Sequence, residues 1–379
     1  MRVARAVVYL GAALTLSVGL SRPFLGMHSW RQTQNAMVAR NFARDTLDPT
    51  VTQLDLGGGG LLYGVNLPVL CWPTGVAWRV AGTEPAAVPR LLALIATLAA
   101  AWFLERLGRR LAGPGAGLLA AVLFLQAPLI AGYGASFLED AVMLAFLGLA
   151  VERAHAWGAR PRWRDALLAG LGVALTVGIK LPVGAAVVPA TAAAALLGAR
   201  GTRGWRALFH PQLLVALTAG IGLGISYYGA LYWRSLTVDH FAWAFTFEPG
   251  TDKWGSAAML TDPETSVLLF KRVTQEVCGF AGLGLVLLAL GASIRDPRIA
   301  LPLAWLAAVG AYMFVSLGGQ LAHDYYQLPL VQPLALLGAF AFATPAGGGP
   351  RPRWRAGVAI AGTVLVLVMC LELNPFRRF

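Results

Sequence analysis

Long uninterrupted blocks of apolar residues constrain the fold of this chain more than any other feature of its sequence. Stretches of about 18 or more apolar residues with few charges are candidates for spanning helices, because about 20 helical residues cross the hydrocarbon of a bilayer. Charged residues make up only 13% of the 379 residues, whereas a soluble domain has roughly 25%. The chain is therefore predicted to be an all-α polytopic membrane protein.

Eleven of these blocks are predicted to be transmembrane helices of a single domain, residues 1–379, with no soluble domain at either end. The first block follows Arg2 and Arg5 but has no small-residue cleavage site before Ser21, so it is expected to stay as an uncleaved helix. The predicted helices cover approximately residues 3–20, 86–105, 114–132, 138–152, 165–180, 182–198, 211–232, 276–293, 299–317, 327–344 and 356–372.

The net charge of +12 is distributed as a membrane topology predicts. Arginines gather in the short connections 106–110, 153–164, 200–206 and 351–355, which the positive-inside rule assigns to the cytoplasm together with the N-terminus. This distribution accounts for the basic excess without a nucleic-acid partner. The Arg-, Ala- and Gly-rich composition suggests a bacterium with a GC-rich genome, so we expect a multi-pass protein of the inner membrane with its active face toward the periplasm.

Two outer segments, 21–85 and 233–275, are too long for simple turns. The first contains HSWRQTQNAMVARNFARD (28–45), in which Trp30 and Phe42 are expected to share one apolar stripe. An amphipathic helix of this kind suits the membrane interface. Because the chain has no predicted soluble domain, its chemistry is expected on these outer loops and on the outer ends of the helices.

The first outer loop continues with a second apolar stretch, NLPVLCWPTGVAWRV (66–80). Tryptophan is enriched at the level of the lipid headgroups. The stretch is therefore expected to be another interfacial helix, with Trp72 and Trp78 at headgroup level.

Polar residues on the predicted outer face come from four distant parts of the sequence. A helix bundle can bring such segments together in one cavity where lipid gives way to water. The candidates are His28, Arg31, Gln32, Gln34, Arg40 and Asp55 in the first loop, Glu139 and Asp140 at the start of the fourth helix, Lys180 between the fifth and sixth, and His323, Asp324, Tyr325 and Tyr326 where the chain enters the tenth.

Several of these groups have a structural interpretation beside a functional one. Glu139 and Asp140 either place negative charge at a helix N-terminus or anchor a metal, a base or substrate hydroxyls. Lys180 either extends from a helix end toward the headgroups or directs its ammonium at a phosphate oxygen. Asp55, which precedes four glycines, either forms a turn or acts as a general base where a ligand approaches the backbone closely.

The remaining candidates suit recognition of a sugar or a phosphate. Arg31 also suits the holding of lipid headgroups, and Tyr325 and Tyr326 are partly expected from the aromatic belt of a membrane protein. The chain has no P-loop and no Rossmann fingerprint, and its three cysteines form no metal-binding pattern. No cofactor is therefore predicted, and a divalent metal has no support in the sequence.

Four segments, taken in their order and spacing, resemble bacterial members of the GT-C superfamily of membrane glycosyltransferases, in the group of the dolichyl-phosphate-mannose–protein mannosyltransferases and aminoarabinose transferases. The resemblance covers residues 20–190 best. The segments are HSWRQTQNAMVARNF (28–42), LDLGG (54–58) followed by NLPVLCW (66–72), YGASFLEDAVMLAF (133–146) and HDYYQLPLVQPLALL (323–337).

This resemblance implies a GT-C-type bundle that transfers a monosaccharide, with inversion, from a polyprenyl-phosphate-linked donor to an acceptor hydroxyl at the outer face. It implies that Asp55 is the general base, that Asp140 corresponds to the acid of the second loop, and that Lys180 contacts the donor phosphate. The chain departs from its relatives in two places. Relatives have an acid where it has Trp30-Arg31-Gln32, and many have Glu where it has Asn66.

Two other functions stay open from the sequence. One is a transporter or flippase of lipid-linked sugars, and the other is a non-catalytic relative that binds a lipid phosphate. Transporters commonly show internal repeats and polar residues at the membrane midplane. This chain has no visible repeat and gathers its polar residues at one face, which favours an enzyme.

Overall fold

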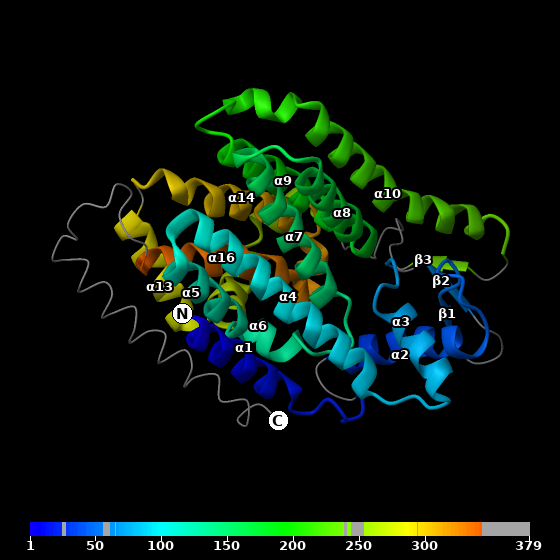
Figure 1. Cartoon of the computed structure of the whole chain (residues 1–379). Coiled ribbons are helices and arrows are strands. Elements are labelled where there is room, and N and C mark those ends of the chain that lie inside the picture. Colours follow the sequence, from blue (N-terminus) through cyan, green and yellow to red (C-terminus); the bar gives the residue numbers. More distant parts are fainter. Residues whose placement is uncertain are drawn as a thin grey trace.

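The chain folds into a helix bundle with a small lobe at one end (Figure 1). The computed structural model describes residues 1–24, 28–55, 61–64, 66–238, 241–243, 254–293 and 295–342. The predicted helix 356–372, the glycines 57–60 and part of the segment 233–275 lie outside these residues.

The bundle follows the predicted apolar blocks. Its longer helices are α1 (Arg2–Ser17), α4 (Ala87–Ala112), α5 (Pro114–Leu125), α7 (Asp140–Ala159), α8 (Trp163–Ile179), α9 (Gly184–Gly198), α10 (Pro211–Ser235), α13 (Gly279–Ser293), α14 (Ala300–Val315) and α16 (Leu328–Ala339). Within the described residues, four helical segments are long and apolar enough to cross a membrane, and a fifth qualifies if a pair bent by 95° forms one span. The number of eleven spans stays a prediction.

Short helical pieces join these helices. The predicted helix 114–132 is two helices, because Pro128 lacks the N–H that would continue α5 and leaves Ala127 extended. The shorter elements are α6 (Pro128–Tyr133), α11 (Ala257–Thr261), α12 (Pro263–Arg272), α15 (Leu317–Ala322), a π-helical turn (Val273–Val277) and the 3₁₀ turns η1 (Leu181–Val183), η2 (Gly204–Phe209), η4 (Pro297–Ile299), η5 (Asp324–Gln327) and η6 (Phe340–Phe342).

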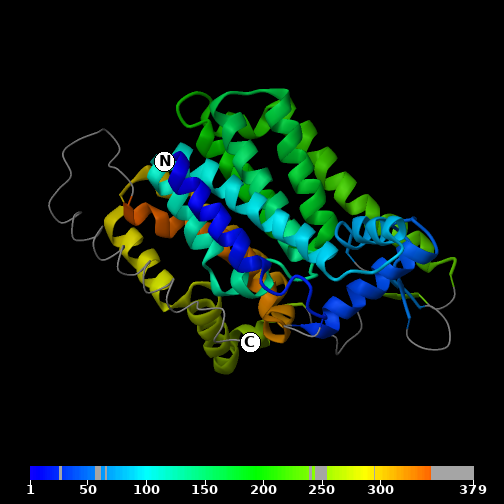
Figure 2. The same cartoon turned by 60° about the horizontal axis from the view of Figure 1, so that its bottom comes forward.

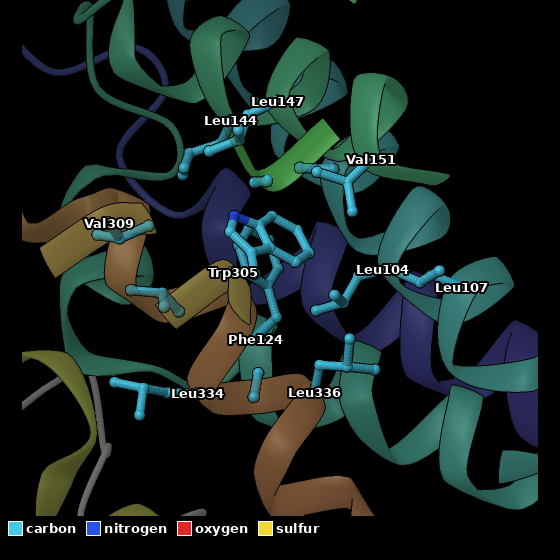
Figure 3. Packing of buried hydrophobic residues seen from close by; sticks show 14 of the residues in the cluster. Leu104, Leu107, Phe124, Leu144, Leu147, Val151, Trp305, Val309, Leu334 and Leu336 are labelled. Carbon is cyan, nitrogen blue, oxygen red and sulfur yellow. The ribbon is translucent and has the colours of Figure 1, made fainter. Parts of the chain in front are cut away.

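The bundle core packs side chains from helices that are distant in sequence. Trp305 of α14 lies among Phe124 of α5 and leucines of α4, α7 and α16 (Figure 3). Helices α8 and α10 approach so closely that a Cβ on Gly220 would lie 2.4 Å from the carbonyl oxygen of Gly170. Small residues permit this approach, as is usual between helices in membranes.

The lobe consists of α2 (Ser29–Arg44), α3 (Cys71–Ala81) and a three-stranded sheet of β1 (Gln53–Leu54), β2 (Leu61–Gly64) and β3 (Phe241–Trp243). Strand β1 pairs with β2 antiparallel, and β2 pairs with β3 parallel. Figure 2 shows the lobe at one end of the bundle and the N-terminus at the other. Helices are therefore present in both predicted stretches, and their place at the membrane interface stays a prediction, whereas the sheet was not expected.

Two tryptophans of the lobe differ from expectation. Trp30 is 61% exposed and Phe42 is fully buried. They cannot share a stripe, because 12 residues along a helix with 3.6 residues per turn place them about a third of a turn apart. Trp78 is 3% exposed, so its ring is covered by protein and does not face lipid headgroups: its Nε1 donates to the Pro85 carbonyl and its ring packs beside Phe137. Trp72, at 39% exposure, remains accessible.

Buried carboxylates near the N-terminal end of the bundle are paired with arginines. Glu105, which is 1% exposed, accepts from Arg5 at 2.8 Å. Glu152, which is fully buried, accepts from three guanidinium groups, those of Arg106, Arg110 and Arg153. We call Glu152 and these three residues the arginine cluster.

Candidate functional site

A buried ion pair stands where α7 begins and α8 ends. Nζ of Lys180 lies 2.8 Å from Oδ1 of Asp140, and these residues are 3% and 8% exposed. Helix α8 stops at Ile179 and Pro182 follows, so the chain turns and Lys180 points inward. Burial lowers the pKa of Lys180, and the carboxylate of Asp140 opposes that shift. Lys180 therefore does not reach toward headgroups.

Aromatic rings cover this ammonium. Nζ of Lys180 lies 3.9 Å from the ring centroid of Tyr326 and 4.9 Å from that of Tyr325, within the range of a cation–π contact. The His323 ring stacks on both tyrosines, with centroids 5.2 and 5.7 Å apart. The segment His323–Tyr326 thus joins the ion pair, as the sequence predicts.

A second group of polar side chains adjoins the rings. Nε2 of His28 lies 2.9 Å from Oδ1 of Asp324, and the hydroxyl of Tyr133 donates to both oxygens of this carboxylate at 2.7 and 2.9 Å. Burial and the neighbouring Asp324 raise the pKa of Tyr133, so its phenol keeps its proton and donates. The side chains of His28 and Asp324 are 27% and 20% exposed. This group faces solvent more than the ion pair does.

Two side chains of helix α2 form hydrogen bonds to the backbone just before Glu139 and Asp140. The side-chain oxygen of Gln32 accepts from the Phe137 amide at 3.1 Å, and Nδ2 of Asn35 donates to the Phe137 carbonyl at 2.8 Å. Both amide side chains are buried. Gln32 therefore positions Glu139 and Asp140 rather than reaching toward a ligand.

Glu139 is buried beside the ion pair. It is 6% exposed, and its Oε1 accepts from the Cys71 thiol at 3.6 Å. Burial raises the pKa of Glu139 to about 8, although the charge of Arg31 acts against this shift. The carboxyl group is therefore mostly protonated at neutral pH and can donate a hydrogen bond.

Arg31, in the first turn of α2, acts electrostatically on the ion pair and its neighbours. Its charge acts on Glu139, Lys180 and Tyr325, and its Nη1 donates to Gln34 at 3.1 Å. Arg31 and Lys180 thus bring two positive charges to one region. Such a region suits an anion.

Asp55 lies on the exposed surface of the lobe. Its Oδ1 accepts from Nδ2 of Asn41 at 3.3 Å, and Asn41 also holds the Gln53 carbonyl at 2.9 Å. Among the described residues, no hydrogen bond or ion pair joins Asp55 to Lys180 or Asp140.

Most of the predicted residues thus form one cluster, while Asp55 stands apart in these contacts. Three contributors were not singled out from the sequence: Asn35, Cys71 and Tyr133. All three lie inside the segments that carry the family resemblance, which is the signal that could have found them. No group of three or more His, Cys, Asp or Glu side chains in the described part of the chain is arranged to hold a metal ion.

Comparisons with known proteins place this geometry in context. Residues 66–226 match the family model described as dolichyl-phosphate-mannose-protein mannosyltransferase. ArnT from Cupriavidus metallidurans in the apo state is 16% identical with a TM-score of 0.62, covering 95% of this chain and 62% of ArnT. ArnT from Cupriavidus metallidurans bound to undecaprenyl phosphate is 16% identical with a TM-score of 0.61, and the match covers 95% of this chain and 63% of ArnT.

The arabinofuranosyltransferase AftD from Mycobacteria is 17% identical with a TM-score of 0.54, covering 97% of this chain and 27% of AftD. No curated protein matches the chain. The chain spans about three fifths of the length of ArnT, and at these identities the likeness is one of fold.

Proposed function

Because this chain has the fold of the GT-C membrane glycosyltransferases, as four of its sequence segments imply, we propose that it transfers a monosaccharide from a polyprenyl-phosphate-linked donor to an acceptor hydroxyl. Undecaprenyl phosphate bound to ArnT supports a polyprenyl phosphate as the leaving group. The lobe and the N-terminus lie at opposite ends of the bundle (Figure 2). This arrangement supports a site on the outer face, with the N-terminus in the cytoplasm of a bacterial cell.

The buried Lys180–Asp140 pair is the observation that carries this proposal. An ammonium has three donors, so Asp140 can take one while the others remain for phosphate oxygens. Displacement at the anomeric carbon builds negative charge on the departing phosphate. In this proposal, Lys180 and Arg31 stabilise this charge, and the burial of Lys180 supports a site that largely excludes water.

The proposed reaction is a single displacement at the anomeric carbon of the sugar. The acceptor oxygen bonds to the anomeric carbon from the face opposite the phosphate, the bond from this carbon to the phosphate oxygen breaks, and polyprenyl phosphate leaves. The hydroxyl proton passes to a general base. Asp55, the base that the family resemblance implies, stays a candidate, and we propose that Glu139, whose raised pKa favours the protonated form, donates to a sugar hydroxyl.

The test uses the purified protein in vesicles with a panel of radiolabelled polyprenyl-phosphate sugars. Label that moves to a new acceptor supports the proposed transfer. Label that crosses the vesicle unchanged identifies a transporter instead, and binding without either identifies a non-catalytic protein.

Lys180→Met examines the role of the ion pair in this assay. The variant is expected to lose transfer by about 100-fold or more, since a buried electrostatic stabiliser contributes roughly that factor. Lys271→Met is the matched control, because Lys271 is exposed on α12. Equal activity in both variants would remove Lys180 from the site.

A further inference from the structure

His28 has a backbone conformation that its surroundings must hold. Its φ is 48°, the only positive φ of a non-glycine residue in the part of the chain that the structure describes. Such a conformation is unfavourable for a residue with a Cβ and is often found at functional sites. As the N-cap of α2, His28 makes no side-chain capping hydrogen bond, so capping does not explain its placement.

The partners of Asp324 define which ring nitrogen of His28 carries hydrogen. Asp324 accepts from the Tyr133 hydroxyl and from the Tyr325 amide, the latter at 2.8 Å. Two donors suit an ionised carboxylate, which can only accept. Nε2 of His28, at 2.9 Å, therefore donates to Asp324, and the lone pair of the neutral imidazole lies on Nδ1.

His28 and Lys180 approach the same aromatic ring. The Tyr325 ring centroid lies 4.9 Å from that of His28 and 4.9 Å from Nζ of Lys180. A phosphate bound at the ammonium would hold its sugar beside this ring, within reach of the imidazole. His28 is also more exposed than the ion pair, which gives a hydroxyl from outside a path to it.

We propose that Nδ1 of His28 is the general base that removes the proton of the acceptor hydroxyl, with Asp324 and Tyr133 as positioning residues. This proposal rests on the proposed function and gives the role of base to His28 in place of Asp55. Imidazole accepts protons readily near neutral pH, whereas a solvated carboxylate is a weak base there.

In this scheme the proton passes from the acceptor hydroxyl to His28 and then to water. It moves from the acceptor hydroxyl to Nδ1 while the oxygen bonds to the anomeric carbon, and the electron pair of the breaking bond goes to polyprenyl phosphate. The imidazolium is stabilised by Asp324 and then returns its proton to water, since the His28 side chain is 27% exposed.

The decisive variant is His28→Asn, because asparagine tolerates a positive φ and so keeps the start of α2. We expect transfer in a single turnover to fall by about 10²- to 10⁴-fold, while binding of radiolabelled polyprenyl-phosphate sugar stays within about twofold. His210→Asn is the control, because His210 caps α10, away from the cluster, and asparagine is also a good N-cap.

Asp324→Asn tests positioning through a pH profile. The groups around His28 are Asp324, Tyr133, Tyr325, His323 and Arg31. Removing the carboxylate leaves the imidazolium without its anionic partner, so the acid limb of kcat should move to lower pH. A purely structural role would lower kcat without moving this limb.

Three results would overturn the proposal. They are near-normal transfer by His28→Asn, loss of donor binding in that variant, or loss of transfer in Asp55→Asn with His28→Asn active. The last result assigns the base to Asp55 and leaves the proposed function intact. Failure of the wild-type protein to transfer any label would instead refute the proposed function itself.

Discussion

The two ends of the bundle bury carboxylates in different ways. At the N-terminal end, Glu152 is surrounded by three guanidinium groups. At the lobe end, Asp140 has one ammonium, which also lies 3.9 Å from the ring centroid of Tyr326. The carboxylates are comparably buried, at 0% and 8% exposure, so burial does not distinguish the two regions.

The two regions differ in whether groups near the ion pairs remain open to a ligand. The arginine cluster uses its carboxylate fully, and such a network holds helices together. The pair at the lobe end adjoins the half-exposed His28 and Asp324 and the strained backbone of His28. We infer that the first region serves stability and the second serves chemistry, and the following variants test this separation.

Glu152→Gln should have the largest effect on stability. It leaves three partly buried guanidinium groups without this buried anion, and breaking a buried ion pair typically costs about 3–5 kcal/mol. The free energy of unfolding in detergent should fall by about that amount, while transfer per folded molecule stays unchanged. A large loss of transfer in the folded fraction would contradict the inference that the arginine cluster serves stability alone.

Asp140→Asn should mainly affect chemistry. Lys180 loses the partner that orients it, so kcat is expected to fall by about 100-fold. The fall in the free energy of unfolding should be smaller than for Glu152→Gln, because Asp140 pairs with one cation whereas Glu152 pairs with three. Thermal unfolding and single-turnover transfer, measured on the same preparation, compare the two; an inactive variant that also unfolds as Glu152→Gln does would contradict this expectation.

Glu139→Gln should change how stability depends on pH. With a pKa of about 8 in the folded protein, above its ordinary 4.5, Glu139 binds a proton that the unfolded chain has released. Its contribution is therefore complete at low pH and is lost as the pH rises through about 8. The wild type should lose several degrees of Tm between about pH 4.5 and pH 8, where the folded protein holds this proton and the unfolded chain does not, and the variant should lose less. An identical loss in both proteins would contradict the burial of an ionisable Glu139.

Glu84→Gln should have the smallest effect. Glu84 pairs with Arg40 and Arg44 at the lobe surface, with side-chain exposures of 26%, 41% and 63%. Exposed pairs contribute about 0–1 kcal/mol, so Tm and transfer should stay close to those of the wild type. A marked loss of transfer would extend the functional site to this surface.

The sequence predicted the bundle and most of the cluster for a simple physical reason. Apolar blocks define spanning helices, and a helix bundle can bring together helix ends that share one side of a membrane. This logic placed Glu139, Asp140, Lys180 and the segment 323–326 together, and the fold confirms the GT-C resemblance. The roles of individual residues at the site stay predictions.

Features set by tertiary packing could not be predicted in this way. Trp78 resembled a headgroup anchor but is buried against Phe137, and the small sheet depends on pairing between residues that are distant in sequence. Asn35 and Tyr133 carry no pattern of their own and become visible only through their contacts with Phe137 and Asp324.

The most direct test of the central claim is a structure of the protein with bound undecaprenyl phosphate. If the Lys180–Asp140 pair is the donor site, a phosphate oxygen will lie about 3 Å from Nζ of Lys180, with the prenyl chain leading into lipid. A phosphate bound instead at the arginine cluster, with the surroundings of Lys180 unchanged, would contradict the claim.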